Sequence, residues 1–310
     1  MTLTATKPVR LRFGDSRFSR WADRHRRLVL ITPALIFVVA MIGIPLGWTV
    51  WLSLTDAEGS VRTPYDFIGL GNYISVFTDT ERFWPAAIRT AVFTTAALVL
   101  ELTFGMMIAL LLRRPFKAQG PVRVAILLPF VATPVAIAMM WRLILDPNIG
   151  AANQLLGLVG IPPQPWLSGT VTAMPTLILI DVWQFTPMIT IILLAGLTAL
   201  PDEPDEASRI DGANAWQRFW YVTLPLMRPV IVVAAILRCI DAFKTFDLLY
   251  VAKGEGGGSF HEAETLNIYA YGLSFRYYEF GLASTVLIVF FFLIVITMLL
   301  INLARKPRRP

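Results

Sequence analysis

The sequence is poor in charged residues and in the residues that build most catalytic and metal sites. Only 15% of its 310 residues are charged, against roughly 25% in an ordinary soluble domain. One cysteine, Cys239, excludes a disulfide framework, and with only two histidines, His25 and His261, the usual zinc sites are excluded too. No GxxxxGK[ST], HExxH or GxSxG segment occurs, so the chain has no P-loop and no familiar hydrolase signature. The low content of charged residues excludes a soluble enzyme. Because the chain has no P-loop, a process powered by ATP would need another subunit to hydrolyse it.

Hydrophobic residues make up 56% of the chain, and they gather in six long runs. The runs cover residues 28–52, 90–112, 122–145, 172–199, 229–250 and 281–303. At about 1.5 Å per residue, each run as a helix reaches or exceeds the ~30 Å hydrocarbon core of a bilayer. The sequence therefore predicts an all-α integral membrane bundle of six spans over 28–303. A basic arm at 1–27 precedes the bundle and a basic tail at 304–310 follows it. The first run is too long for the core of a signal peptide, so we expect it to stay as a helix.

The basic residues lie unevenly on the two sides of this predicted bundle. Of the 27 Lys and Arg residues, 19 lie in the two termini and the even-numbered connections, and five lie in the odd-numbered connections. The positive-inside rule then places both termini and the 200–228 connection in the cytoplasm. The net charge of +6 is thus explained by orientation and by contact with anionic lipid, and we expect no nucleic-acid partner.

The connection at 200–228 is the only long one on the predicted cytoplasmic side. Acidic residues crowd its first turn, where a helix dipole favours them, and Gly212 follows where a turn needs an unhindered backbone. Pro225 and Pro229 then lead into the next span. This pattern predicts two short amphipathic helices joined by a turn, a shape suited to docking a partner protein.

At this point the sequence resembles a known family. Glu206-Ala207-Ser208-x-x-x-Gly212, followed after nine residues by Val222-x-Leu224-Pro225, is similar to the EAA loop of binding-protein-dependent ABC importer permeases. Ser208 stands where that family usually has Ala, and Val222 where it usually has Ile. Similar stretches at 69–73, 141–148, 181–187, 241–247 and 271–275 narrow the resemblance to maltose- and trehalose-type permeases. In place of the family's Thr-x-Gly-Gly-Pro turn, this chain has a glycine-rich segment at 253–258 without Pro. The sequence therefore does not predict the conformation of this segment.

The resemblance implies a type I ABC importer permease in a bacterial inner membrane, with no catalytic site of its own. Its implied partners are a second homologous permease, two ATPase subunits that hold ATP and Mg, and an external sugar-binding protein. The chain itself would bind no cofactor and no metal. The implied cargo is a sugar, most simply a disaccharide such as trehalose or maltose. The residues that match the coupling loop are Glu206, Ala207, Ser208, Asp211, Gly212, Leu224 and Pro225.

Polar residues inside and beside the spans are candidates for the substrate pathway. They are Asp181, Trp183, Gln184, Asp241, Lys244, Asp247, Asn267 and Tyr269. Carboxylates and amides bond sugar hydroxyls, and an aromatic ring covers the apolar face of a sugar. A structural interpretation competes with this one. Arg238, Asp241, Lys244 and Asp247 are spaced three apart, so they would share a helical face and form the ion pairs Arg238–Asp241 and Lys244–Asp247.

Structural interpretations also compete for the other polar candidates. Glu101 on the second span is expected to be a contact between helices rather than a substrate ligand. Asn267, Tyr269 and Tyr271 would line an outer vestibule, or the two tyrosines would serve as belt residues at the membrane edge.

Two further functions compete with sugar import. One is an ABC permease for another solute such as a glycerol phosphate ester, which would want an uncompensated basic cluster in its pathway. The other is a stand-alone secondary transporter, which would show inverted repeats and paired broken helices. The sequence names neither the sugar nor which of the two paired permeases holds most of its contacts.

Overall fold

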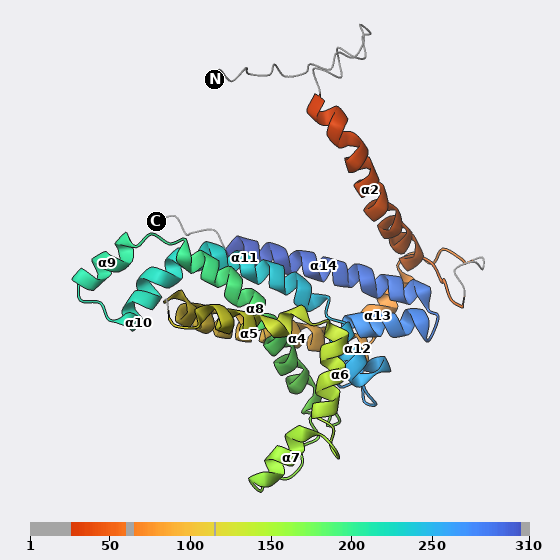
Figure 1. Cartoon of the computed structure of the whole chain (residues 1–310). Coiled ribbons are helices and arrows are strands. Elements are labelled where there is room, and N and C mark those ends of the chain that lie inside the picture. Colours follow the sequence, from red (N-terminus) through yellow and green to blue (C-terminus); the bar gives the residue numbers. More distant parts are fainter. Residues whose placement is uncertain (1–25, 60–64, 115, 305–310) are drawn as a thin grey trace, which may run out of the picture. The chain divides into compact units, whose positions relative to one another are not determined.

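A computed structural model of the chain describes residues 26–59, 65–114 and 116–304 (Figure 1). Within these ranges the elements are helices, and the only strand-like feature is an isolated bridge between Thr55 and Phe67. The all-α prediction is therefore confirmed. Most of the predicted basic arm and nearly all of the tail lie outside the described residues. Contacts divide the chain into residues 1–51 and 52–310, which we describe separately.

In the first unit, helix α2 (Arg26–Ser53) contains the first predicted span, with Pro33 and Pro45 inside it. In the second unit, three helices match the second, fourth and sixth predicted spans. These are α4 (Phe83–Arg113), α8 (Ala173–Thr198) and α14 (Phe280–Ala304). Together with the helical run Ala215–Lys253, the described residues hold five helices long and apolar enough to cross a membrane.

The third predicted span is wrong as a single helix. Residues 122–145 form two helices, α5 (Gln119–Val131) and α6 (Pro134–Ile144), which are bent by 94° relative to each other. Pro134 opens α6, and the ring of a proline drives the preceding residue out of the helical region. Thr133 is accordingly extended, with ψ 143°. Counted as one broken span, this pair is the sixth crossing.

The fifth predicted span also departs from expectation, at both ends. The second short helix of the 200–228 connection is not separate: α10 (Ala215–Arg218) runs through a π-helical turn, Phe219–Thr223, into α11 (Leu224–Phe243). The wide turn lets the Leu224 N–H reach the Phe219 carbonyl just before Pro225, which has no N–H to donate. At its other end α11 stops, and α12 (Asp247–Lys253) begins after a break. The four charged residues at 238–247 therefore share no continuous helical face.

Shorter helices complete the second unit. They are α3 (Gly71–Thr78), α7 (Ala151–Leu158), α9 (Glu203–Ile210), the 3-10 turn Glu255–Gly257 and α13 (Leu266–Phe275). The glycine-rich segment, whose conformation the sequence left open, is a tight turn with positive φ at Gly254, Gly256, Gly257 and Gly258. Lys253 anchors it, because its Nζ donates to Glu262 Oε1 and to the Leu167 carbonyl, each at 2.5 Å.

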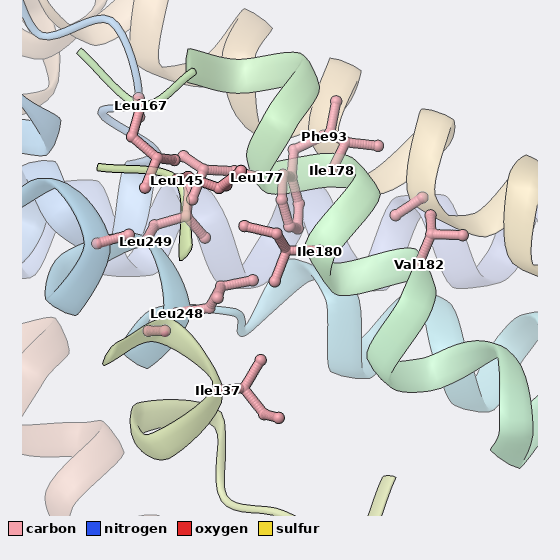
Figure 2. Packing of buried hydrophobic residues seen from close by; sticks show 14 of the residues in the cluster. Phe93, Ile137, Leu145, Leu167, Leu177, Ile178, Ile180, Val182, Leu248 and Leu249 are labelled. Atoms are coloured by element: carbon pink, nitrogen blue, oxygen red, sulfur yellow. The ribbon is translucent and has the colours of Figure 1, made fainter. Parts of the chain in front are cut away.

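The core forms where α4, α8 and α11 approach closely. A Cβ on Gly105 of α4 would lie 2.7 Å from Ile189 Cγ2 on α8, and one on Gly196 of α8 would lie 2.7 Å from Val230 Cγ1 on α11. Small residues at such crossings let helix backbones pack tightly in a membrane. Figure 2 shows one core cluster, in which Leu177 and Ile180 of α8 gather with Leu248 and Leu249 of α12. This packing fixes the polar side chains described next.

Candidate functional site

The turn after α9 is a Schellman motif built on Gly212. The Ala213 N–H donates to the Ser208 carbonyl at 2.9 Å, and the Gly212 N–H donates to the Arg209 carbonyl at 3.1 Å. Gly212 has φ +80°, a left-handed conformation that side chains disfavour. The prediction that this turn needs glycine is confirmed, and the reason lies in its backbone, because a Cβ there would meet no atom within 4 Å.

The next residues restart the helix through a capping box. Asn214 Oδ1 accepts from the Gln217 N–H, and Gln217 Oε1 accepts from the Asn214 N–H, both at 2.9 Å. The two motifs satisfy the backbone groups that helix ends leave free, so the α9–α10 turn has a defined shape. Because α10 continues into α11, a force on this turn acts directly on a membrane-spanning helix.

The outer surface of the α9–α10 turn is exposed. Of the predicted coupling residues, Glu206, Ala207, Asp211, Gly212 and Pro225 are exposed, and Ser208 and Leu224 are half-buried. Three large apolar side chains beside them were not predicted to have a role: Ile210 is 87% exposed, Trp216 70% and Tyr221 80%. Ile210 carried a signal, since it is a large aliphatic residue on an otherwise polar helix. Acid and apolar groups side by side form a surface suited to a protein partner.

A buried charge cluster joins α4, α8 and α11 inside the bundle. Arg238 makes a bidentate pair with Glu101, with Nε–Oε2 2.6 Å and Nη2–Oε1 2.9 Å, and its Nη2 also donates to Asp181 Oδ2. The side chains of Arg238, Glu101 and Asp181 are fully buried. The Phe185 ring lies 4.2 Å from the guanidinium carbon. The predicted role of Glu101 as a contact between helices is confirmed, while Asp181 lies inside this cluster rather than on an open surface.

One member of the cluster reaches its edge. Asp241 Oδ2 accepts from Arg238 Nη1 at 3.2 Å, and its side chain is 50% exposed. The predicted Arg238–Asp241 ion pair is therefore confirmed. The predicted Lys244–Asp247 pair is wrong: both residues are described and exposed, and no ion pair joins them, because the break after α11 separates them.

Aromatic and polar side chains meet at that break. A cavity of about 260 Å³ is lined by Lys244, Phe246, Asn267 and Tyr271, among others. The Phe246 and Tyr271 ring centroids are 5.1 Å apart. Asn267 Nδ2 donates to the Phe243 carbonyl at 3.0 Å, which fixes the amide at the end of α11. Two predicted pathway residues, Lys244 and Asn267, are thus brought together with Tyr271, which was expected beside Asn267, whereas Phe246 was given no role.

The remaining predicted residues lie elsewhere. The exposed Trp183 ring packs edge-on against Trp141, with centroids 5.5 Å apart. Gln184 is buried and donates to the Ala132 carbonyl at 3.2 Å, across the bend between α5 and α6. Its Oε1 has no hydrogen-bond partner among the described residues. The Tyr269 hydroxyl donates to Asp79 at 2.9 Å, so Tyr269 belongs to a structural contact rather than to the cavity.

Asp79 organises the start of α4. Its carboxylate accepts from the N–H groups of Glu81, Arg82 and Phe83 at 2.9–3.1 Å. Burial alone would raise the pKa of Asp79, but these donors and the Tyr269 hydroxyl outweigh it and hold the pKa below its ordinary value. No group of His, Cys, Asp and Glu side chains in the part of the chain that the structure describes is arranged to hold a metal ion.

Comparison with known proteins settles the family. Residues 101–309 match the binding-protein-dependent transport system inner membrane component. The chain belongs to this family. It is 36% identical over 270 residues to a trehalose/maltose transport system permease protein of Thermococcus litoralis, covering 86% of this chain and 88% of that one. It is 34% identical over 275 residues to a trehalose transport system permease protein of Mycobacterium tuberculosis, covering 88% and 86%. The family resemblance in the sequence is confirmed, as is the expectation of a membrane component rather than an enzyme.

Two solved structures share the fold of this permease. A bacterial ABC transporter involved in the import of the acidic polysaccharide alginate superposes with a TM-score of 0.79 at 19% identity, covering 94% of this chain and 98% of that one. The same TM-score and identity are found for a bacterial alginate ABC transporter in complex with an alginate pentasaccharide-bound periplasmic protein. At this identity the likeness shows the fold, which is that of an ABC importer permease.

Proposed function

We propose that this chain is a permease subunit that carries a sugar across the inner membrane and is driven by an ATPase docked on the α9–α10 turn. The observation that carries the proposal is the exposed, conformationally fixed turn at Gly212, which is continuous with a membrane-spanning helix in a permease without a P-loop. Energy for transport must reach such a chain through a protein contact.

The docking chemistry follows from the exposed side chains. Glu206 and Asp211 offer carboxylates to a basic pocket, and Ile210 offers an apolar anchor between them. Closure of two ATPase subunits around ATP and Mg would pull this turn toward that of a second homologous permease. Because α10 runs into α11, the pull reaches Arg238 and, through its ion pairs, α4 and α8.

The sugar route would pass the break between α11 and α12. Asp241, Lys244 and Asn267 present a carboxylate, an ammonium and an amide near this break, and Phe246 and Tyr271 present aromatic faces beside the last two. Hydroxyl groups bind the first set, and the apolar face of a sugar ring packs on the second. An external solute-binding protein would deliver the sugar on the side opposite the α9–α10 turn.

The substrate class is inferred from relatives whose names specify trehalose and maltose. Both are neutral disaccharides. The buried Arg238 supports a neutral cargo, because Glu101 and Asp181 already compensate its charge and leave it unavailable to a phosphate. We therefore propose a disaccharide in preference to a glycerol phosphate ester. Both termini would be cytoplasmic, as the positive-inside rule predicts.

The test is uptake by the complete transporter reconstituted in liposomes, with labelled trehalose, maltose and glycerol 3-phosphate supplied with the binding protein. We expect ATP-dependent uptake of a disaccharide and loss of uptake in the variants Asp241→Asn and Asn267→Ala. Glu81→Gln, an exposed carboxylate away from the cavity, is the matched control. Preferred uptake of the phosphate ester would contradict the substrate class. Normal disaccharide uptake in both pathway variants would contradict the route.

A further inference from the structure

A large groove lies between the end of α4 and the α9–α10 turn, and apart from Trp216 and Leu224 its lining residues have no role in the proposed transport function. Its volume is about 980 Å³. One wall is a face of α4 made by Leu102, Thr103, Met106, Met107, Leu110 and Leu111. These residues fall in two rows at i, i+4 spacing, so they form one continuous strip along the helix. We call this cavity the α4–α10 groove.

The groove has the length and polarity of one membrane leaflet. From Leu102 to Arg113 the helix rises about 17 Å, close to half of the ~30 Å hydrocarbon core. Apart from Thr103, whose hydroxyl donates to the Val99 carbonyl at 2.7 Å, the strip is apolar up to Arg113 and Arg114, which end α4 at the predicted cytoplasmic surface. A lipid acyl chain laid along the strip would therefore place its headgroup at these arginines.

The cytoplasmic end of the groove has an excess of positive charge. Four arginines line it, Arg113, Arg114, Arg209 and Arg218, against two carboxylates, Asp202 and Asp205. Asp205 is shared, at 2.7 Å from Arg209 and 3.6 Å from Arg218, and Asp202 lies 3.7 Å from Arg113. Arg114 is exposed and forms no ion pair with the residues that the structure describes. The cytoplasmic end of the groove therefore carries unpaired positive charge, which a bound anion would neutralise.

Aromatic side chains stand at the same level. Trp216 and Trp220 line the groove with ring centroids 5.6 Å apart, and Trp216 is 70% exposed. Tryptophan is enriched at membrane–water interfaces, where its ring meets lipid headgroups. A soluble anion would neutralise the arginines but leave the apolar strip uncovered. An apolar protein helix would cover the strip but leave the arginines without a counter-charge. Only a lipid with an anionic headgroup matches both ends.

We propose that the α4–α10 groove binds an anionic phospholipid of the cytoplasmic leaflet. Its phosphate is held by Arg113 and Arg114, and an acyl chain lies along the α4 strip past Met107. Basic pockets between helices on the cytoplasmic side of membrane proteins bind such headgroups. The bound lipid would brace the α9–α10 turn against α4, so anionic lipid would set how efficiently ATPase closure reaches the spans.

The test uses the complete transporter in nanodiscs of phosphatidylcholine with or without phosphatidylglycerol, followed by native mass spectrometry of the lipids retained on this subunit. We expect wild type to retain phosphatidylglycerol at least tenfold over phosphatidylcholine. Arg113→Gln with Arg114→Gln should abolish this preference. Arg123→Gln, an exposed arginine on the same predicted side but outside the groove, should leave it unchanged.

A second variant tests the apolar half independently of charge. Met107→Trp fills the groove and should reduce lipid retention several-fold, whereas Ile88→Trp, at an exposed site of α4 about five turns away and outside the strip, should not. A photo-crosslinker at Met107 should label lipid. Equal retention of the two lipids by wild type, unchanged preference in the arginine variant, or a crosslink to a protein helix would each overturn the proposal. Assembly is checked by gel filtration, and if the arginine variant does not assemble, Met107→Trp and the crosslink decide.

Discussion

Removing Arg238 tests the buried cluster that ties three spans together. Arg238→Met keeps the volume of the side chain but removes the partner of Glu101 and Asp181, whose side chains are fully buried. Breaking a buried ion pair by removing one partner costs about 3–5 kcal/mol, because a buried charge is left uncompensated. Here two carboxylates lose the same partner, so we expect a loss at the upper end of that range. The variant should insert into the membrane and unfold at a much lower temperature.

Removing the two carboxylates together with Arg238 gives a second test of the cluster. Combining Arg238→Met with Glu101→Gln and Asp181→Asn removes all three charges, and most of the lost stability should return. Cys239, the only cysteine in the chain, is buried beside Arg238, so labelling of its thiol by a fluorescent maleimide during heating reports unfolding of this region. Arg142→Met is the control, since Arg142 also lies in a span but is exposed. A midpoint for Arg238→Met within 2 °C of that control, or no recovery in the triple variant, would refute the reasoning.

Three further results are expected. Gly105→Val should destabilise the α4–α8 crossing by about 1–3 kcal/mol through overpacking against Ile189, measured by the same thiol labelling; a neutral result would contradict the crossing. Asp79→Asn should cost about 1 kcal/mol at pH 7, because an amide NH2 in place of Oδ2 cannot accept from the Phe83 N–H and the Tyr269 hydroxyl. Since the folded pKa of Asp79 is lowered, the stabilisation by its carboxylate is present above its unfolded pKa and is lost as pH falls below about 4, so wild type and variant should converge in acid melting curves. In a Cys239→Ser background, Ser208→Cys should react only with reagents that enter from the cytoplasm, and labelling from outside would contradict the topology.

The span positions were predictable because hydrophobic length is a direct consequence of bilayer thickness. The sharp bend at Thr133 was not predictable, even though Pro134 indicates that the helix is disturbed there. A proline can kink a helix slightly or end it, and which one occurs depends on the neighbours: here Gln184 of α8 donates to the carbonyl of Ala132 at the bend. The continuity of α10 with α11 was not predicted, because Pro225 was expected to separate the two helices. A π-helical turn allows the helix to continue past this proline.

The coupling turn was predictable from its own residues, since the Schellman motif and capping box are local structures set by Gly212, Asn214 and Gln217. The charge cluster was predictable only in part. The Arg238–Asp241 pair joins residues three apart on one helix, whereas the contacts with Glu101 and Asp181 join residues 137 and 57 positions away. A single sequence shows that such buried charges need partners, but the fold decides which ones they find.

The most direct test of the account is a crosslink from the exposed α9–α10 turn in the assembled transporter. A photo-reactive amino acid at Ile210, which is 87% exposed, should crosslink to the ATPase subunit, more strongly when a non-hydrolysable ATP analogue holds the subunits closed. Combining it with Gly212→Val, which forces a β-branched residue into φ +80°, should abolish both the crosslink and sugar-stimulated ATP hydrolysis. A crosslink to the external binding protein, or normal coupling in the Gly212→Val variant, would contradict the claim that this turn conveys the energy of ATP to the spans.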